Sequence, residues 1–542
     1  MKTYGIYLAY PPEIDLRAEG LGRLLGEFLK EATNRKDVKF VVACPSWTRE
    51  LLIELFKSIE IPAEAIEIIG PERKPKVLEI YHRYLAYKRR ERRKSRLARF
   101  FGHLRNLLRQ GTSRTESYLV ATRSTLLLAV LALLALPFIA IGLALKIALD
   151  LSAYLIPYAR RKWDPWHGRY LTVIGRLTET PQASSTSVRL YRLMEGAEAR
   201  ILVKQINARR DISAWYAPAA FWPHFNQIKA PRLTCVPDVV LSEFPVAFSS
   251  VGGDRFLQTF GLIDATIGGG DHFVTYSDQT KYRTLVDRYH VSPDAISVVP
   301  HGANRLDDLI TVSGFPDNIA STNAFCVNLL HGALPKAVDS LGATNFDSGD
   351  VQFLFYASQF RPNKNVISLL RAYEFLLRRR YIGHKLMLTG NPKVLPEIAQ
   401  FIRKHNLQND VLCLHGLSAR ELAACYRLAD LAVNPSMSEG GCPFTLTEAL
   451  SVGTPVIMAR IAVTEEVITE PELQDVMLFD PYDWKDIAAR IEWALQNREA
   501  LLHRQLKFYD GHSQRTWRHV VDEHIAILDR ISGATAQPEV TS

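Results

Sequence analysis

Two cations in the second half of this 542-residue chain are close enough in sequence to act together. The segment SQFRPNKN places Arg361 and Lys364 on a loop between an expected strand and an expected helix. Cations at this spacing can bind a diphosphate through charge-assisted hydrogen bonds. A solvated surface pair is the alternative that the sequence leaves open.

Two carboxylates follow in ADLAVNPSMSEGGCPFTLTEALSVGTPVI, residues 429–457. Glu439 lies on a glycine-rich turn after an expected strand, where it could accept sugar hydroxyls. Glu448 lies near the start of the next expected helix, where it could accept both hydroxyls of a ribose, as the acidic residue of dinucleotide folds does. The turn adds three backbone N–H groups suited to an anion, those of Gly440, Gly441 and Cys442.

A third candidate segment lies close to the N-terminus. Gly20 and Gly22 stand where a loop becomes an amphipathic helix, expected over 19–32. Backbone N–H groups and the helix dipole favour an anion at such a place. Ordinary turn chemistry is the alternative.

The pattern of short apolar runs and amphipathic segments predicts the scaffold for these residues. Strand-like runs alternate with helices of 10–15 residues, which is typical of parallel sheets covered on both faces. In such folds, ligands bind outside the carboxyl ends of the strands. The expected strands are 4–9, 38–43, 201–203, 213–216, 233–236, 272–276, 297–299, 353–357, 385–389, 411–414, 431–433 and 456–458.

Length and composition limit the alternatives. A chain of 542 residues is too long for one hydrophobic core, and 47% apolar with 23% charged residues excludes disordered and fibrous classes. Six scattered cysteines without a C-x-x-C pair argue against a disulfide scaffold or a zinc ribbon. The N-terminus lacks the long apolar region of a secretory signal, so we expect the chain to start in the cytoplasm.

One segment carries all of the basic excess. Residues 73–123 hold 16 Lys and Arg against 3 Asp and Glu, so the remainder of this +9 chain is slightly acidic. Residues 124–145 then contain no charge, a length that meets the rule of about 20 residues for spanning a bilayer. Basic flanks favour the cytoplasmic side at both ends, and Pro137 at the middle would break a helix. We therefore expect a re-entrant or in-plane membrane segment over Arg73–Lys162, with lipid favoured over nucleic acid, and a buried helix as the alternative.

These segments, in this order, resemble the family 4 glycosyltransferases. The opening YGIYLAY…EGLGRLL is similar to the family's first strand and glycine loop, and HFVTYSDQTKYRTLVDRYHVSPDAISVVPHGAN to its serine-containing strand, helix and turn. The phrases LMLTG, VLCLHGLSARELAACYRLADLAVNPSMSEGG and TEALSVGTPVI resemble its second domain, and HSQRTWRHVVDEHIAIL its final helix. The resemblance covers most of the chain outside about 72–198.

The resemblance implies the α/β GT-B fold, in which two doubly wound, Rossmann-like domains face a cleft. The first would combine 1–71 with 199–332, around a membrane-associated insertion at 72–198. The second would be 351–515, followed by a crossover helix at 516–533.

The resemblance also implies roles for the candidate residues. Lys364, assisted by Arg361, would bind the donor diphosphate, Glu448 the ribose and Glu439 the transferred sugar. Gly20 and Gly22 would line the phosphate and acceptor side of the cleft, and the backbone around Gly416 would face the base. Family members need no metal, and the sequence contains no D-x-D motif. No cofactor is therefore expected.

Two departures from the family pattern affect the site. Eight residues separate Glu439 from Glu448 where the family has seven, so the turn after Glu439 is one residue longer than in the family. The family's His-Asp pair at the end of a middle strand is replaced by Pro237 and Asp238, which leaves Asp238 as a catalytic candidate or as a simple cap.

The leading hypothesis is an enzyme that retains anomeric configuration. It would move a hexose from a GDP- or UDP-sugar to a glycan or lipid-linked saccharide of a surface polysaccharide, on the cytoplasmic face of the cell membrane. The first alternative is a non-catalytic, nucleotide-sugar-binding scaffold at the membrane. The second is a GT-B epimerase or a soluble disaccharide synthase, which the apolar segment disfavours.

Overall fold

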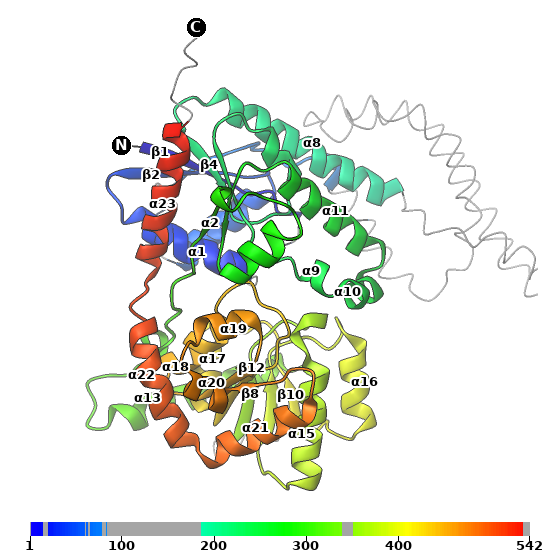
Figure 1. Cartoon of the computed structure of the whole chain (residues 1–542), viewed down its shortest axis with the longest axis vertical. Helices are drawn as coiled ribbons and strands as arrows, with labels where there is room; N and C mark the ends of the chain where they lie inside the picture. Colours follow the sequence, from blue (N-terminus) through cyan, green and yellow to red (C-terminus); the bar gives the residue numbers. More distant parts are fainter. Residues whose placement is uncertain are drawn as a thin grey trace, which may run out of the picture.

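Two parallel sheets, each flanked by helices, form the two lobes of the molecule (Figure 1). The computed structural model describes residues 2–12, 14, 20–59, 61–62, 65–78, 83, 186–338 and 351–534. The expected membrane segment at 124–145 and most of the basic run lie outside the described residues. Within the described ranges, no helix combines the length and apolar character needed to span a bilayer.

The first lobe contains a seven-stranded parallel sheet in the order β3-β2-β1-β4-β5-β6-β7. The middle strands are apolar on both faces because helices cover both, as the alternating pattern predicts. Its strands are β1 Lys2–Tyr7, β2 Val38–Ala43, β3 Glu67–Ile69, β4 Ala214–Ala217, β5 Arg232–Cys235, β6 His272–Thr275 and β7 Ile296–Val298. Its helices are α1 Gly20–Thr33, α2 Thr48–Ser58, α8 Thr186–Ala208, α9 Val240–Glu243, α10 Pro245–Gly252 and α11 Asp254–Gly268, with short turns η1 Pro223–Gln227, η2 Thr280–Val286 and η3 Pro293–Ala295.

The second lobe contains a six-stranded parallel sheet in the order β10-β9-β8-β11-β12-β13. Its strands are β8 Phe353–Tyr356, β9 Lys385–Leu388, β10 Val411–Cys413, β11 Leu431–Asn434, β12 Val456–Ala459 and β13 Leu478–Phe479. Its helices are α12 Asp307–Ile310, α13 Asn318–Ala333, α15 Val366–Arg379, α16 Pro396–Lys404, α17 Ala419–Leu428, α18 Phe444–Ser451, α19 Ala462–Val467, α20 Pro471–Met477, α21 Trp484–Gln496 and α22 Arg498–His512, with turns η4 Leu334–Lys336 and η6 Pro362–Lys364.

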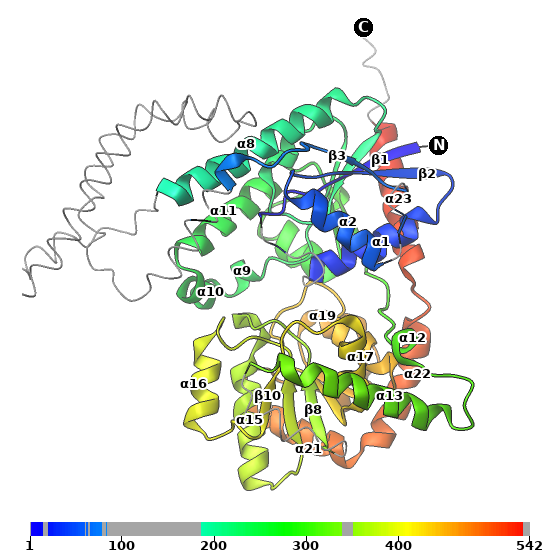
Figure 2. The same cartoon turned by 180° about the vertical axis from the view of Figure 1, so that it is seen from behind.

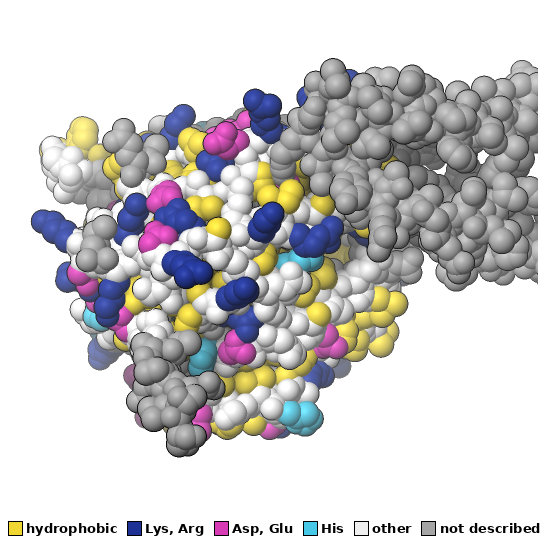
Figure 3. Space-filling view, turned by 90° about the horizontal axis from the view of Figure 1, so that it is seen from above, with side chains coloured by type: hydrophobic (Ala, Val, Ile, Leu, Met, Phe, Trp, Pro, Cys, Tyr) yellow, Lys and Arg dark blue, Asp and Glu magenta, His cyan; other side chains and the backbone are white. Residues whose placement is uncertain are grey.

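Helix α23, Trp517–Ala534, returns from the second lobe and packs against α1 and β4 of the first (Figures 1 and 2). Its buried side chains join the core of the first sheet, among them Val520, Val521 and Leu528. At the end of the first lobe seen in Figure 3, Lys and Arg side chains gather with acidic partners beside several of them. The ion pair of Arg209 with Glu67 (2.6 Å) is one such contact in the first lobe, and partly exposed pairs of this kind contribute little to stability.

The structure differs from the sequence expectations at two boundaries. The expected strand at 201–203 lies inside the helix α8, which begins at Thr186 within the expected insertion. An apolar run of three residues is too short to distinguish a strand from a turn of buried helix. Helices α12 and α13, expected in the first domain, pack into the core of the second through Ile310, Cys326 and Leu330. Helical periodicity indicates an apolar face but not which sheet that face covers.

The aromatic run AWYAPAAFWPHF, residues 214–225, belongs to the core. Trp215 and Phe225 are fully buried, and Trp222 is nearly so, with its ring 5.0 Å from that of Tyr10. The run therefore stabilises the first lobe.

Candidate functional site

The carboxyl ends of the two sheets meet at the glycine-rich turn after β11. Ser277, which follows β6, donates a hydrogen bond from Oγ to the carbonyl oxygen of Gly440 at 2.8 Å. A Cβ placed on Gly440 would lie 1.6 Å from the carbonyl oxygen of Pro237, which follows β5. Only glycine permits this approach, so the turn closes tightly against the first lobe.

Lys364 and Glu439 form an ion pair at the centre of this junction. The distance from Lys364 Nζ to Glu439 Oε1 is 2.5 Å, and only about a fifth of each side chain is exposed. The loops that carry them are joined by the buried Asn363, which accepts a hydrogen bond from Met437 N at 2.8 Å and donates to Ser438 O at 3.1 Å. Asn365 then adopts a left-handed conformation (φ 52°) that turns the chain into α15. The loop geometry thus holds Lys364 on Glu439.

Asp238 contributes a second carboxylate from the opposite lobe. Burial raises the pKa of the Asp238 carboxyl, and the like charge of Glu439 acts in the same direction. The positive charges of Lys364 and Arg361 oppose that rise. The structure therefore brings four of the predicted site residues into one electrostatic cluster at the junction of the two lobes. A cluster with three carboxylate or ammonium groups half-buried together is typical of a functional site.

Glu448 lies deeper in the same junction. Its side chain is 2% exposed and accepts a hydrogen bond from Asn304 Nδ2 at 3.3 Å, while the Asn304 backbone N–H donates to Thr447 Oγ1 at 3.3 Å. Glu448 is the fifth residue of α18, one turn further into the helix than the sequence predicted. Sequence reasoning missed Asn304, although it ends the VVPHGAN phrase after β7.

Two other residues at the junction were not among the predicted site residues. Glu243, at the end of α9, hydrogen-bonds Ser438 of the second lobe, and burial raises the pKa of its carboxyl. His301 lies 7% exposed beneath the turn, with its ring 4.5 Å from that of Phe444. Its Nε2 would be 3.4 Å from a Cβ on Gly441, and its ring hydrogen-bonds the backbone of the buried Cys442. The PHG phrase was the available sequence signal for His301.

The other predicted glycines lie on separate elements. Gly416 lies in an exposed loop after the edge strand β10, with φ 73°, and its carbonyl oxygen accepts a hydrogen bond from Lys336 Nζ at 3.2 Å. Gly20 is the first residue of α1, and Gly22 is buried in its first turn. The structure does not join Gly416 to the Lys364–Glu439 pair, because β10 lies three strands from β11.

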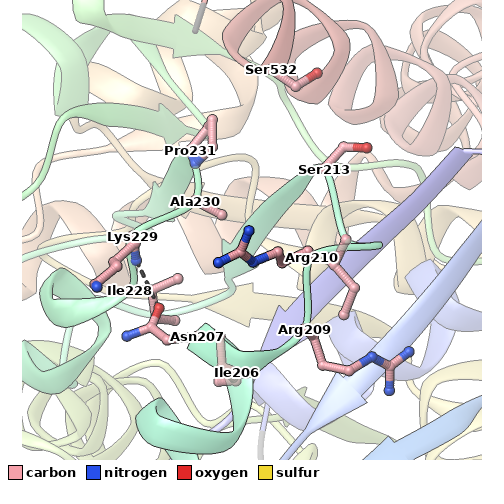
Figure 4. Close-up of a pocket in the computed structure, with 11 residues that line it drawn as sticks. Ile206, Asn207, Arg209, Arg210, Ser213, Ile228, Lys229, Ala230, Pro231 and Ser532 are labelled. Atoms are coloured by element: carbon pink, nitrogen blue, oxygen red, sulfur yellow. Dashed lines mark hydrogen bonds between the residues drawn. The ribbon is translucent and has the colours of Figure 1, made fainter. Parts of the chain in front are cut away.

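A cavity of about 530 Å³ opens at the end of the first sheet where its strands begin (Figure 4). It lies beside residues that precede β4 and β5, so it faces away from the carboxyl ends of the strands. The lining residues are Ile206, Asn207, Arg209, Arg210, Ile212, Ser213, Ile228, Lys229, Ala230, Pro231 and Ser532. Among the described residues, no group of three or more His, Cys, Asp and Glu is placed to hold a metal.

Because His301 is buried at the junction of the two lobes, we expect the stability of the folded protein to fall at acidic pH. Burial lowers the pKa of His301 to about 4, below its ordinary 6.5, so the folded protein holds this ring neutral. The stability that results is present above pH 6.5 and is lost as the pH falls towards 4, by about 3 kcal/mol for a shift of this size. His301→Gln is therefore expected to reduce the fall in melting temperature between pH 7.5 and pH 5. The exposed His503→Gln is the control, and an unchanged pH profile in His301→Gln would contradict this account.

Comparison with known proteins gives this arrangement a context. Residues 343–507 match the family model described as glycosyl transferases group 1. The O-antigen chain mannosyltransferase B of Escherichia coli is 28% identical over 147 residues, which are 27% of this chain and 37% of that protein. The MMP alpha-(1->4)-mannosyltransferase of Mycolicibacterium hassiacum is 26% identical over 238 residues, 42% of this chain and 55% of that protein. The chain thus spans between about a third and a half of these relatives.

Solved structures share the fold over nearly the whole chain. The Anabaena protein HepE, solved in complex with UDP and glucose, has a TM-score of 0.54 at 11% identity, covering 98% of this chain and 100% of that one. A glycosyltransferase from Rickettsia africae has a TM-score of 0.52 at 11% identity, covering 98% of both chains. Residues 343–507 therefore match the model of glycosyl transferases group 1, and the two parallel sheets of the chain share their fold with these solved structures.

Proposed function

We propose that the protein transfers a hexose from a nucleotide sugar to a glycan or lipid-linked saccharide, with retention of anomeric configuration, in the synthesis of a surface polysaccharide. The observation that carries the proposal is the cluster of Lys364, Arg361, Glu439 and Asp238 at the junction of the two lobes, beside the buried Glu448. Cations and carboxylates placed in this way suit a donor with a diphosphate at one end and hydroxyls at the other.

The described contacts suggest how each residue would act. On donor binding, the diphosphate would form an ion pair with the ammonium of Lys364 in place of Glu439. The carboxylate of Glu439 would then be available to accept hydrogen bonds from hydroxyls of the sugar. Glu448 would accept the ribose hydroxyls, held in place by Asn304. Most of the catalytic effect would come from positioning and from charge stabilisation of the departing diphosphate. A donor phosphate oxygen would draw the acceptor proton, so no metal or other cofactor is part of the proposal.

The relatives support the donor and acceptor classes. HepE was solved with UDP and glucose, and separately with UDP-glucose, which favours a nucleotide-linked hexose here. The relatives named as mannosyltransferases make a GDP-linked donor the first alternative to test. We place the protein at the cytoplasmic face of the cell membrane, held by the Arg73–Lys162 region.

A panel of donors tests the proposal. The full-length protein in detergent is expected to melt at a higher temperature with one class among GDP-mannose, UDP-glucose, ADP-glucose and dTDP-glucose, because a ligand at 100 times its Kd stabilises by about 2.7 kcal/mol. Glu448→Gln is expected to weaken that donor by about 10- to 100-fold, as a charged hydrogen-bond acceptor is lost. The exposed Glu499→Gln serves as the control.

The same panel separates the enzyme from the scaffold. Transfer of labelled sugar to the acceptor, with the anomeric configuration read by NMR, is expected with the donor that raises the melting temperature. Pro237 in place of the expected histidine is the observation that favours a non-catalytic relative. Donor binding without transfer would support that relative, and the absence of any donor effect would reject nucleotide-sugar binding.

A further inference from the structure

Helices α10 and α11 expose an unusual amount of apolar surface. We define the apolar rim as Pro245, Val246, Val251, Leu257 and Leu262. Val246 is 80% exposed, Leu257 66%, Val251 50% and Leu262 43%. Every residue of α10 is at least partly exposed, although its composition, PVAFSSVG, is largely apolar. Grouped apolar exposure of this kind marks an interaction surface.

The apolar rim is also depleted of charge. The sequence has no charged residue between Glu243 and Asp254, and α11 adds only Arg255 and Asp264 after that. The two helices pack on each other, so the exposed apolar residues of α10 and α11 lie on neighbouring elements. A surface with so few charges gives little electrostatic basis for binding nucleic acid or an acidic protein, whereas a hydrocarbon phase would bury its apolar side chains favourably.

The rim begins beside the candidate site. It begins two residues after Glu243, which hydrogen-bonds Ser438 of the second lobe. The carbonyl oxygen of Ser242 accepts a hydrogen bond from Arg288 at 3.1 Å, which fixes the start of the rim to the first lobe. In Figures 1 and 2, α10 projects at the edge of the first lobe that faces the second. A surface bound by the rim would therefore adjoin the cleft.

The flanks of the stretch from 84 to 185 leave the molecule on this same side. Leu78 packs with Met194 of α8, so both described flanks of that stretch lie against one helix. The free end of α8, Thr186, and the helices α10 and α11 lie on one side of the molecule in both Figure 1 and Figure 2. That stretch includes the uncharged residues 124–145 and the basic residues 88–109. A membrane that bound these residues would face the rim.

We propose that the apolar rim docks on a lipid bilayer and holds the mouth of the cleft against the membrane surface. Its side chains enter the boundary between headgroups and acyl chains, as the apolar face of an interfacial helix does. The consequence for activity rests on the proposed function: a lipid-linked acceptor would reach the cleft along the surface instead of from solution.

Environment-sensitive labels test the docking directly. All six native cysteines are buried, so a nitrobenzoxadiazole label will attach selectively to an introduced cysteine. Val246→Cys and Leu257→Cys report on the rim, and Tyr482→Cys, which is 72% exposed in the second lobe, is the matched control. With vesicles of equal parts phosphatidylcholine and phosphatidylglycerol, we expect a blue shift and quenching by nitroxide lipids at the two rim positions only.

Three outcomes would overturn the proposal. The labelled full-length protein could fail to bind the vesicles, or it could bind while both rim labels remain in water. A blue shift at the rim without vesicles would show that the protein's own chain or a second copy covers it.

A final variant, Val246→Asp with Leu257→Asp, should keep the donor-induced rise in melting temperature and lose about tenfold or more of transfer to a vesicle-bound acceptor. If no donor raises the melting temperature of the wild-type protein, the proposed function is rejected, whereas the result of the labelling experiment on membrane docking is unaffected.

Discussion

Replacing Lys364 by alanine is expected to lower kcat/KM for sugar transfer by about 10²- to 10³-fold, the usual cost of removing one group that stabilises transition-state charge. The ammonium of Lys364 is 2.5 Å from Glu439 and acts on the carboxyl of Asp238 across the cleft. Without it, the departing diphosphate would meet two carboxylates with only Arg361 to oppose them. Steady-state kinetics with the donor identified by the panel would measure the effect.

The control for this prediction is Lys393→Ala. Lys393 is exposed on the loop before α16, so its loss should leave transfer within about twofold of wild type. A Lys364→Ala enzyme with unchanged kinetics would remove the diphosphate role. The partner variant Glu439→Gln separates two roles of Glu439 in the ion pair. If Glu439 binds the sugar, Glu439→Gln should raise KM for the donor. If Glu439 only positions Lys364, adding Glu439→Gln to Lys364→Ala should cause no further loss.

Gly440→Ala is expected to reduce kcat by about 10²-fold or more while the second lobe still binds donor. The added Cβ would lie 1.6 Å from the Pro237 carbonyl oxygen and 3.0 Å from the Asp238 Cβ, and both belong to the opposite lobe. Because the clash involves backbone, the two lobes cannot close to the observed geometry, and a displacement of about 1 Å costs that much in rate.

The matched control is Gly332→Ala on α13, where an added Cβ meets nothing within 4 Å. It should behave as wild type. Small-angle scattering with donor present should show that wild type is more compact than Gly440→Ala. Equal compactness together with equal rates would show that the turn adapts and that closure on Pro237 is unnecessary for transfer.

Several features of the site could be predicted because they are local. A loop after a buried strand, such as SQFRPNKN after β8, must lie at the carboxyl edge of a parallel sheet, and two such loops on neighbouring strands must lie close together. Strands β8 and β11 are neighbours, so Lys364 and Glu439 share an edge. The order of the phrases also predicted two parallel sheets with a cleft between them.

Other features depended on contacts between segments far apart in sequence. Asn304 ends the VVPHGAN phrase, but the phrase does not indicate its partner, because Glu448 is 144 residues away. The same holds for α13, whose apolar face covers the second sheet and not the first.

The sequence by itself determined the alternation of strands and helices, the two-sheet architecture and the charged residues available to a donor, because strand period, helix period and side-chain chemistry are properties of short segments. Only the tertiary structure decided that Lys364 pairs with Glu439, that His301 lies beneath the turn and Asn304 binds Glu448, and that the α10–α11 rim stays exposed. Pairing and burial are set by how the two lobes pack together, and that packing depends on long-range contacts that no local pattern contains.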